Sequence, residues 1–377
     1  MTTFPAFANC HSHAFHRALR GRPGPSTVSI SDTFWSWREG MYAVAAVLDP
    51  DLYFRLARAT FAEMRLAGIG AVAEFHYVHH APSGTPYRDP NAMSDAVIAA
   101  AVEVGIRLCL LQTCYLRAGF EGEPLNDVQL RFSDRTVSGW AERVATLRAV
   151  HPDSERLRIG AAIHSVRAVA PDDLALVASA FPGAPLHVHV SEQKDENRAC
   201  LAATGRTPVQ LLAEAGVWGP NTTAVHATHL TADDIAILAD AGATACLCPS
   251  TEAELADGIG PSVALREAGV RITLGSDSHT AIDMFHEARA LAMHERLASG
   301  VRDGWAAHDL WKAATVDGYA SLGFAPGDEF ALRESVRIAG APEPLWAATA
   351  NDVVPRLDPD VVASELAWVI DEIGRRL

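Results

Sequence analysis

Residues 4–13 read Phe-Pro-Ala-Phe-Ala-Asn-Cys-His-Ser-His, an apolar, β-rich run that ends in two histidines separated by one residue. Side chains two positions apart in a strand point to the same side, so His11 and His13 are expected to project together from its end. Seven further runs of this kind follow along the chain. The predicted strands are residues 4–10, 71–75, 107–114, 158–163, 186–190, 223–226, 244–248 and 271–275.

The segments between these runs carry apolar residues near helical spacing, which predicts a helix after each strand. The predicted helices are residues 51–67, 91–104, 138–150, 171–180, 207–215, 231–241, 261–268 and 283–299. Eight such units indicate an α/β protein with a parallel sheet, and they fit a closed (β/α)8 barrel of the TIM type better than an open, doubly wound sheet.

The predicted barrel occupies residues 1–324, and residues 325–377 form a C-terminal extension. This extension has strand signal only at residues 335–338 and ends in an amphipathic helix over residues 359–376, which we expect to pack on the barrel. Residues 21–31, rich in Gly, Pro and Ser, are predicted to form a loop over the barrel mouth.

Composition and charge narrow the classes of partner. The formal net charge of −15 argues against nucleic acid or an anionic membrane as a partner, because both would be repelled. Only two of the 31 basic residues are lysines, so a pocket for a small anionic substrate would be built from arginine. Six scattered cysteines, with neither a leader-like segment nor a long apolar run, predict a cytoplasmic protein.

Residues able to bind a metal stand at the ends of four predicted strands, where the active sites of barrels form. They are His11 and His13 on the first strand, His189 with Glu192 after the fifth, His226 on the sixth, and Asp277 after the eighth. One histidine alone is more often a core or surface residue. Neutral imidazoles and a carboxylate gathered at one mouth, with a position left for water, instead describe a catalytic zinc site.

With these residues the chain resembles the amidohydrolase superfamily and, within it, the formimidoylglutamate deiminases of histidine breakdown. The likeness spans roughly residues 9–330. Besides His11-Ser-His13 and Gly275-Ser-Asp277-Ser-His279, it rests on Phe34-Trp-Ser-Trp-Arg38, Phe75-His-Tyr77-Val-His-His80, His164-Ser-Val-Arg167 and His189-Val-Ser-Glu192-Gln. The resemblance implies a zinc-dependent hydrolysis of N-formimino-L-glutamate, or a close carboxylated formimino or amidine analogue, to N-formyl-L-glutamate and ammonia.

The resemblance also implies a role for each matching residue. One zinc ion per chain would be held by His11, His13, His189 and Asp277. The catalytic set would be Glu192, His226 and Asp277, and the substrate's carboxylate would be recognised by Arg38, Tyr77 and Arg167, with His164 as a further candidate. The predicted fourth strand has no lysine, so the carbamylated lysine of the superfamily's two-metal branch has no candidate. Zinc would supply hydroxide by lowering the pKa of water.

Two departures from the family bear on these expectations. The family's accessory β-sandwich is expected to be absent or vestigial here, which bears on whether a homodimer forms. His16 stands where the family commonly has glutamine near the substrate, and its imidazole would change the pattern of donors and acceptors.

Two other functions remain open. The same zinc site with Glu192 could serve a deaminase of a heterocyclic base, whose pocket would offer amide and aromatic groups rather than arginines. A catalytically inactive homologue could instead act as a binding subunit. Arg38, Arg167 and Tyr77 could also be ordinary salt-bridge and packing residues.

Overall fold

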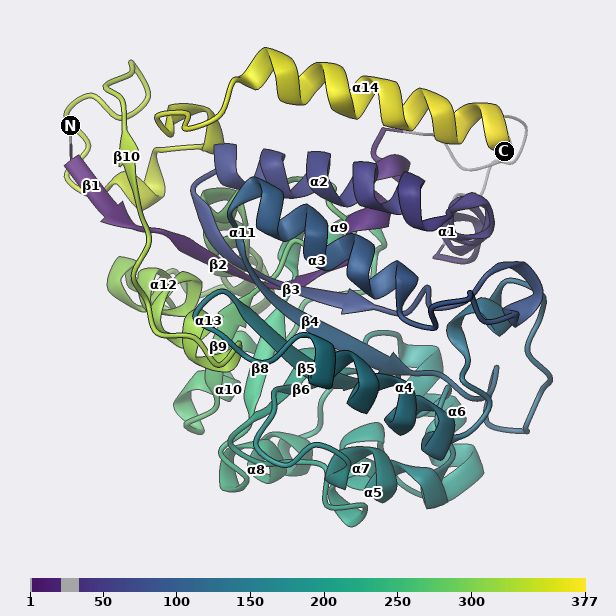
Figure 1. The fold of residues 1–377 in the computed structure, drawn as a ribbon. Coiled ribbons are helices and arrows are strands. Elements are labelled where there is room, and N and C mark those ends of the chain that lie inside the picture. The colour runs from purple at the N-terminus through teal and green to yellow at the C-terminus, as the bar shows by residue number, and fades with distance from the viewer. Residues whose placement is uncertain (1, 22–33) are drawn as a thin grey trace.

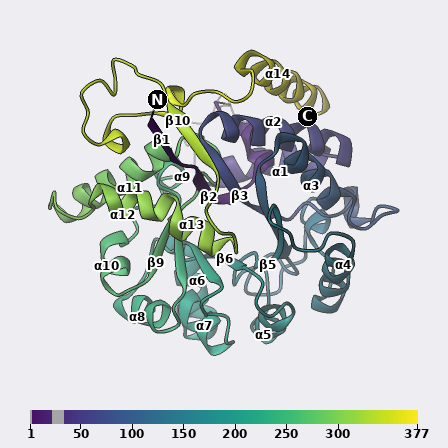
Figure 2. The same cartoon turned by 60° about the vertical axis from the view of Figure 1, so that its left-hand side comes forward.

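A computed structural model describes residues 2–21 and 34–377. Eight parallel strands follow one another around a nearly closed barrel in the order of the sequence, as predicted, and helices surround them (Figures 1 and 2). The strands are β2 (Phe7–Ser12), β3 (Ile69–His76), β4 (Arg107–Cys114), β5 (Leu157–Ile163), β6 (Leu186–Val190), β7 (Thr222–His226), β8 (Thr244–Leu247) and β9 (Arg271–Leu274). The predicted loop at residues 21–31 lies, apart from Gly21, outside the described residues.

The helices that follow the barrel strands are close to the predicted ones. They are α2 (Pro50–Leu66), α3 (Ala92–Val104), α4 (Val137–Val150), α5 (Pro171–Ser179), α7 (Pro208–Glu214), α8 (Ala232–Asp240), α10 (Ser262–Glu267) and α11 (Met284–Ser299). Among the described residues, the periodicity missed five further α-helices. They are α1 (Phe34–Val47), α6 (Lys194–Thr204), α9 (Pro249–Glu254), α12 (Ala307–Ala314) and α13 (Val316–Ser321). Three of these are eight residues or shorter, which is too short for a clear helical period.

The barrel closes where the ends of β2 and β9 meet, and a glycine allows this approach. Ser12 forms a β-bridge with Asp277, and the backbone N–H groups of Ser276 and Asp277 donate to the carbonyl of His11 at 3.1 and 3.0 Å. A Cβ at Gly275 would lie 2.7 Å from the Cβ of His11, closer than real side chains come. Closure therefore brings the histidines of the first strand beside the aspartate after the last.

A second, small sheet corrects the prediction of a single strand over residues 4–10. The run divides at Ala6: β1 (Thr2–Pro5) pairs with β10 (Glu329–Leu332) in an antiparallel sheet, and only β2 enters the barrel (Figure 1). Pro5 has no N–H to donate, which suits a two-stranded edge better than the middle of a barrel. In the described part of the chain, this pair is the only sheet outside the barrel.

The strand signal at residues 335–338 does not correspond to a strand. These residues form a turn with Val336 99% exposed, whereas β10 buries Phe330 and Leu332 on alternate positions. The terminal helix α14 (Pro359–Arg376) lies along α2, where Val362 and Leu366 pack with Ala59 and Ala62 (Figure 1). The boundary placed at residue 325 stays a prediction.

A buried ion-pair network fixes the loops that border the barrel mouth. Asp134, whose side chain is 6% exposed, accepts hydrogen bonds at 2.9 Å from Arg143 Nε and at 3.0 Å from His80 Nε2. Burial alone would raise the pKa of Asp134, but these two partners bring it well below its usual value. A depressed pKa means that the ion pair stabilises the fold above the unfolded-state pKa and that this stability is lost as the pH falls.

Replacing Asp134 with Asn is therefore expected to lower the free energy of unfolding by about 3 kcal/mol at pH 7, because it leaves a buried guanidinium without its counter-charge. Urea unfolding measures this loss of stability. The difference in the free energy of unfolding between wild type and variant should become smaller below about pH 4, where Asp134 of the unfolded chain becomes protonated. The exposed Asp127→Asn variant from the same loop is the control. A difference in the free energy of unfolding that stays constant down to pH 2 would contradict the stabilising role given to the ionised Asp134.

Candidate metal centre and active site

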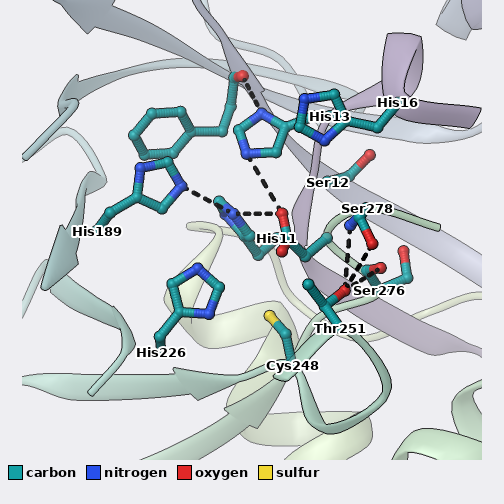
Figure 3. Close-up of polar contacts among 12 residues, drawn as sticks. His11, Ser12, His13, His16, His189, His226, Cys248, Thr251, Ser276 and Ser278 are labelled. Atoms are coloured by element: carbon teal, nitrogen blue, oxygen red, sulfur yellow. Dashed lines mark hydrogen bonds and ion pairs between the residues drawn. The ribbon is translucent and has the colours of Figure 1, made fainter. Parts of the chain in front are cut away.

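Three histidines and an aspartate converge at the carboxyl ends of β2, β6 and β9. The potential ligand atoms of His11, His13 and His189 lie within 4.8 Å of one another. The Asp277 Oδ1 atom is 3.3 Å from His11 Nε2 and 3.4 Å from His13 Nε2. His189 Nε2 is 3.1 Å from His11 Nε2 (Figure 3). All four residues are buried. The structure thus brings the predicted ligand set together.

The protonation of these histidines suits a metal site. The Nδ1 atoms of His13 and His189 lie 2.9 Å from the backbone carbonyls of Phe75 and His164, and only a protonated Nδ1 can donate there. The lone pairs of both Nε2 atoms are then left to point at the centre. Burial lowers the pKa of His13 to about 4, against the opposing Asp277 carboxylate, and lowers that of His11 and His189 well below the usual value. Neutral imidazoles are the form that binds a metal.

The backbone around this cluster adopts unusual conformations. Ser191, His226, Ala227, Asp277 and His279 all have positive φ, between 40° and 68°, although none is glycine. Such conformations are unfavourable for residues with a Cβ and persist where the surrounding structure enforces them, which is common at functional sites. Here they turn the chain directly after β6, β7 and β9, so that side chains following these strands face the mouth.

Glu192 and His226 lie beside the ligand cluster. His226 Nε2 is 3.7 Å from Glu192 Oε1, and both residues line the same cavity as Asp277. Burial raises the pKa of Glu192 above its usual value. Burial would lower the pKa of His226, but the surrounding carboxylates, first that of Glu192 and then that of Glu252, raise it well above normal. Both groups therefore bind a proton more readily than usual, beside the candidate metal ligands.

The sequence reasoning missed Glu252. It lies in α9, directly after β8, and its Oε1 atom is 3.6 Å from His226 Nδ1. Cys248 is fully buried, and its sulfur also lies within 4.8 Å of ligand atoms of His226 and Glu252. An acidic residue just beyond the end of a barrel strand was the available signal for Glu252.

The predicted substrate residues line one cavity with the metal cluster. They are His16, Arg38, Tyr77, His164 and Arg167. His16 Nε2 lies 2.9 Å from the hydroxyl of Tyr77, Arg38 Nε donates to Tyr42 Oη at 2.8 Å, and Arg167 Nε is 3.6 Å from Glu196 Oε1.

Aromatic side chains complete the cavity wall. Trp37, Tyr42, Tyr115 and Phe132 line it together with Tyr77. Tyr42 and Tyr115 were not singled out from the sequence, because one lies on the unpredicted helix α1 and the other follows β4 without a recognisable motif.

Comparison with known proteins identifies the family. The amidohydrolase family model matches residues 2–327. The chain belongs to the amidohydrolase family. This amidohydrolase is 36% identical over 359 residues to the formimidoylglutamate deiminase of Pseudomonas aeruginosa, an alignment that covers 93% of the chain and 79% of that protein. It is also 29% identical over 363 residues to the 8-oxoguanine deaminase of the same organism, with 91% and 77% covered.

Solved structures agree with the barrel of this amidohydrolase. The crystal structure of an amidohydrolase from Brucella melitensis matches with a TM-score of 0.89 at 32% identity and covers 99% of the chain and 90% of its own. A zinc-bound adenosine deaminase from Xanthomonas campestris matches with a TM-score of 0.83 at 22% identity, with 99% and 86% covered, which bears on the fold alone. No helix in the described ranges has both the length and the apolarity needed to cross a membrane.

Proposed function

We propose that this amidohydrolase catalyses the zinc-dependent deimination of N-formimino-L-glutamate, or of a close carboxylated formimino or amidine analogue. The products are N-formyl-L-glutamate and ammonia, since water supplies the oxygen that replaces the terminal nitrogen. One observation carries the proposal: the metal-capable cluster opens into a cavity whose lining also includes the guanidinium groups of Arg38 and Arg167. Two guanidinium groups favour a carboxylate-bearing substrate. The identity to a formimidoylglutamate deiminase supports the same substrate.

The residues at the centre fit zinc. His11, His13, His189 and Asp277 offer the nitrogen and oxygen ligands of a catalytic site. Two imidazole nitrogens only 3.1 Å apart, His11 Nε2 and His189 Nε2, would be held together by a cation between their lone pairs. Zinc, when bound, would acidify water and so supply a nucleophile near neutral pH.

The remaining groups of the site would move protons. His226 would orient the attacking water and help to take its proton, and Glu192, whose Oε1 atom is 3.7 Å from His226 Nε2, would donate a proton to the C=N nitrogen. Asp277 would then take the remaining hydroxyl proton of the tetrahedral adduct and pass it to the departing nitrogen, so that the C=O bond forms as the C–N bond breaks and ammonia leaves. Arg38, Tyr77 and Arg167 would hold the carboxylates of the substrate so that the formimino carbon faces these groups.

Ammonia release by the zinc-loaded protein from N-formimino-L-glutamate tests the proposal. Removing the metal with dipicolinate is expected to lower kcat at least about 10³-fold, and one equivalent of zinc should restore it. The control is the same protein carried through chelation with excess zinc present. Absence of turnover despite one bound zinc per chain would reject this substrate.

A heterocyclic base is the second candidate substrate, favoured by the aromatic lining of the cavity and by the identity to 8-oxoguanine deaminase. Release of ammonia from a purine, with none from formimino acids, would select it. A chain that binds no metal would instead favour an inactive binding subunit.

A further inference from the structure

Gln129 joins two tyrosines in the wall of the active-site cavity. It lies in the short 3-10 helix Gln129–Phe132 and is only 3% exposed. Its Nε2 atom is 2.8 Å from the hydroxyl of Tyr115 and 3.2 Å from that of Tyr42. Tyr42 comes from α1 and Tyr115 from the end of β4, and both line the cavity that holds Arg38 and Arg167.

The orientation of the Gln129 amide follows from its other contact. Its Oε1 atom accepts a hydrogen bond at 3.0 Å from the backbone N–H of Asn126, a group that can only donate. The oxygen must therefore face Asn126, and the NH2 group must face the tyrosines. Because an amide nitrogen donates and never accepts, the hydroxyls of Tyr42 and Tyr115 both act as acceptors toward Gln129.

Both tyrosines are consequently left with a hydroxyl hydrogen to donate elsewhere. The oxygen of Tyr42 also accepts from Arg38 Nε at 2.8 Å, so its lone pairs are engaged. Within the described ranges, no oxygen or nitrogen accepts a hydrogen bond at normal distance from either hydroxyl. The hydroxyls of Tyr42 and Tyr115, together with Arg38 and Arg167, give this wall of the cavity four groups that can donate hydrogen bonds.

We propose that Gln129 is a positioning residue that fixes Tyr42 and Tyr115 as hydrogen-bond donors, and that these two hydroxyls, with Arg38, bind a carboxylate of a dicarboxylate substrate. The inference rests on the proposed function and adds to it. Arg167 and Tyr77 remain for the second carboxylate. A phenol that is free to rotate could present its lone pairs to an anion, whereas the fixed amide excludes that arrangement.

Gln129→Glu replaces the donating NH2 group with an accepting oxygen and changes the shape of the side chain little. One carboxylate oxygen can keep the bond from Asn126, but the other replaces the NH2 group, accepts from both hydroxyls and adds a negative charge. The zinc-loaded wild type is expected to bind glutarate at least about tenfold more tightly than butyrate, and the variant should lose most of this preference. Titration calorimetry with both acids measures it, and since both can approach the metal equally, their ratio reports the second carboxylate.

Two further variants separate a positioning role from a merely structural one. Asn221→Asp adds the same charge at an exposed position that does not line the cavity and should leave the glutarate preference unchanged. Gln129→Met keeps the length without donating and should weaken the preference by about threefold, less than Glu does. If the thermal transition shows that Gln129→Glu does not fold, the glutarate preference is measured in Gln129→Met and Tyr115→Phe instead.

Turnover gives an independent reading. Gln129→Glu should raise KM for N-formimino-L-glutamate about tenfold while kcat stays within about twofold, since Gln129 touches no reacting atom. Equal binding of glutarate and butyrate by the wild type, or an unchanged ratio in Gln129→Glu, overturns the inference. Intact glutarate preference without ammonia release from N-formimino-L-glutamate would reject the proposed function and leave this subsite standing.

Discussion

Replacing Asp277 with Asn is expected to lower kcat for ammonia release about 10⁴-fold and to weaken metal binding. The Oδ1 atom of Asp277 lies within 3.4 Å of Nε2 of both His11 and His13, so its charge is central to the cluster. An amide of the same shape offers a metal no negative charge and cannot carry a proton to the departing nitrogen. Steady-state assays with and without added zinc, together with metal analysis, measure the two effects.

Because added zinc can refill a weakened site, the assay at saturating zinc isolates the proton-transfer role of Asp277. Asp240→Asn, at an exposed position at the end of α8, is the matched control and should retain wild-type metal content and kcat. A fully zinc-loaded Asp277→Asn protein with near-normal kcat would contradict the role given to this carboxylate.

Replacing Glu192 with Gln is expected to lower kcat about 10³-fold without loss of metal. Glu192 belongs to none of the ligand clusters found among the described residues, yet its Oε1 atom is 3.7 Å from His226 Nε2 and it lines the cavity. Glutamine keeps the size and a hydrogen-bond donor but cannot give up a proton. The combination of full metal content and low kcat therefore distinguishes this variant from Asp277→Asn.

Binding of the substrate analogue glutarate provides the check on Glu192→Gln, since an intact pocket should still bind it within about twofold of wild type. Glu155→Gln, on an exposed loop, is the matched control for the loss of one charge. Loss of zinc or of glutarate binding in Glu192→Gln would mean that the residue shapes the site rather than transferring a proton.

The sequence alone was sufficient to predict the barrel and much of its mouth. Strand and helix periods alternated eight times, and the burial of β3 and β6 at every position suits a parallel sheet covered on both faces. His11 and His13 could be paired because residues two apart in a strand share a face. Since parallel strands end at the same rim, His189 and Asp277 were expected beside them, and the structure places them there.

Only the tertiary structure decided which residues meet from segments without a regular period. Glu252 faces His226, and Gln129 holds Tyr42 and Tyr115, because loops and short helices from different barrel units converge above the strands. The division of residues 4–10 between two strands could not be predicted either, because an apolar run does not reveal where its pairing partner changes from β10 to β3. Local patterns thus determine strands and the residues at their ends, whereas contacts between distant loops depend on packing that no local pattern encodes.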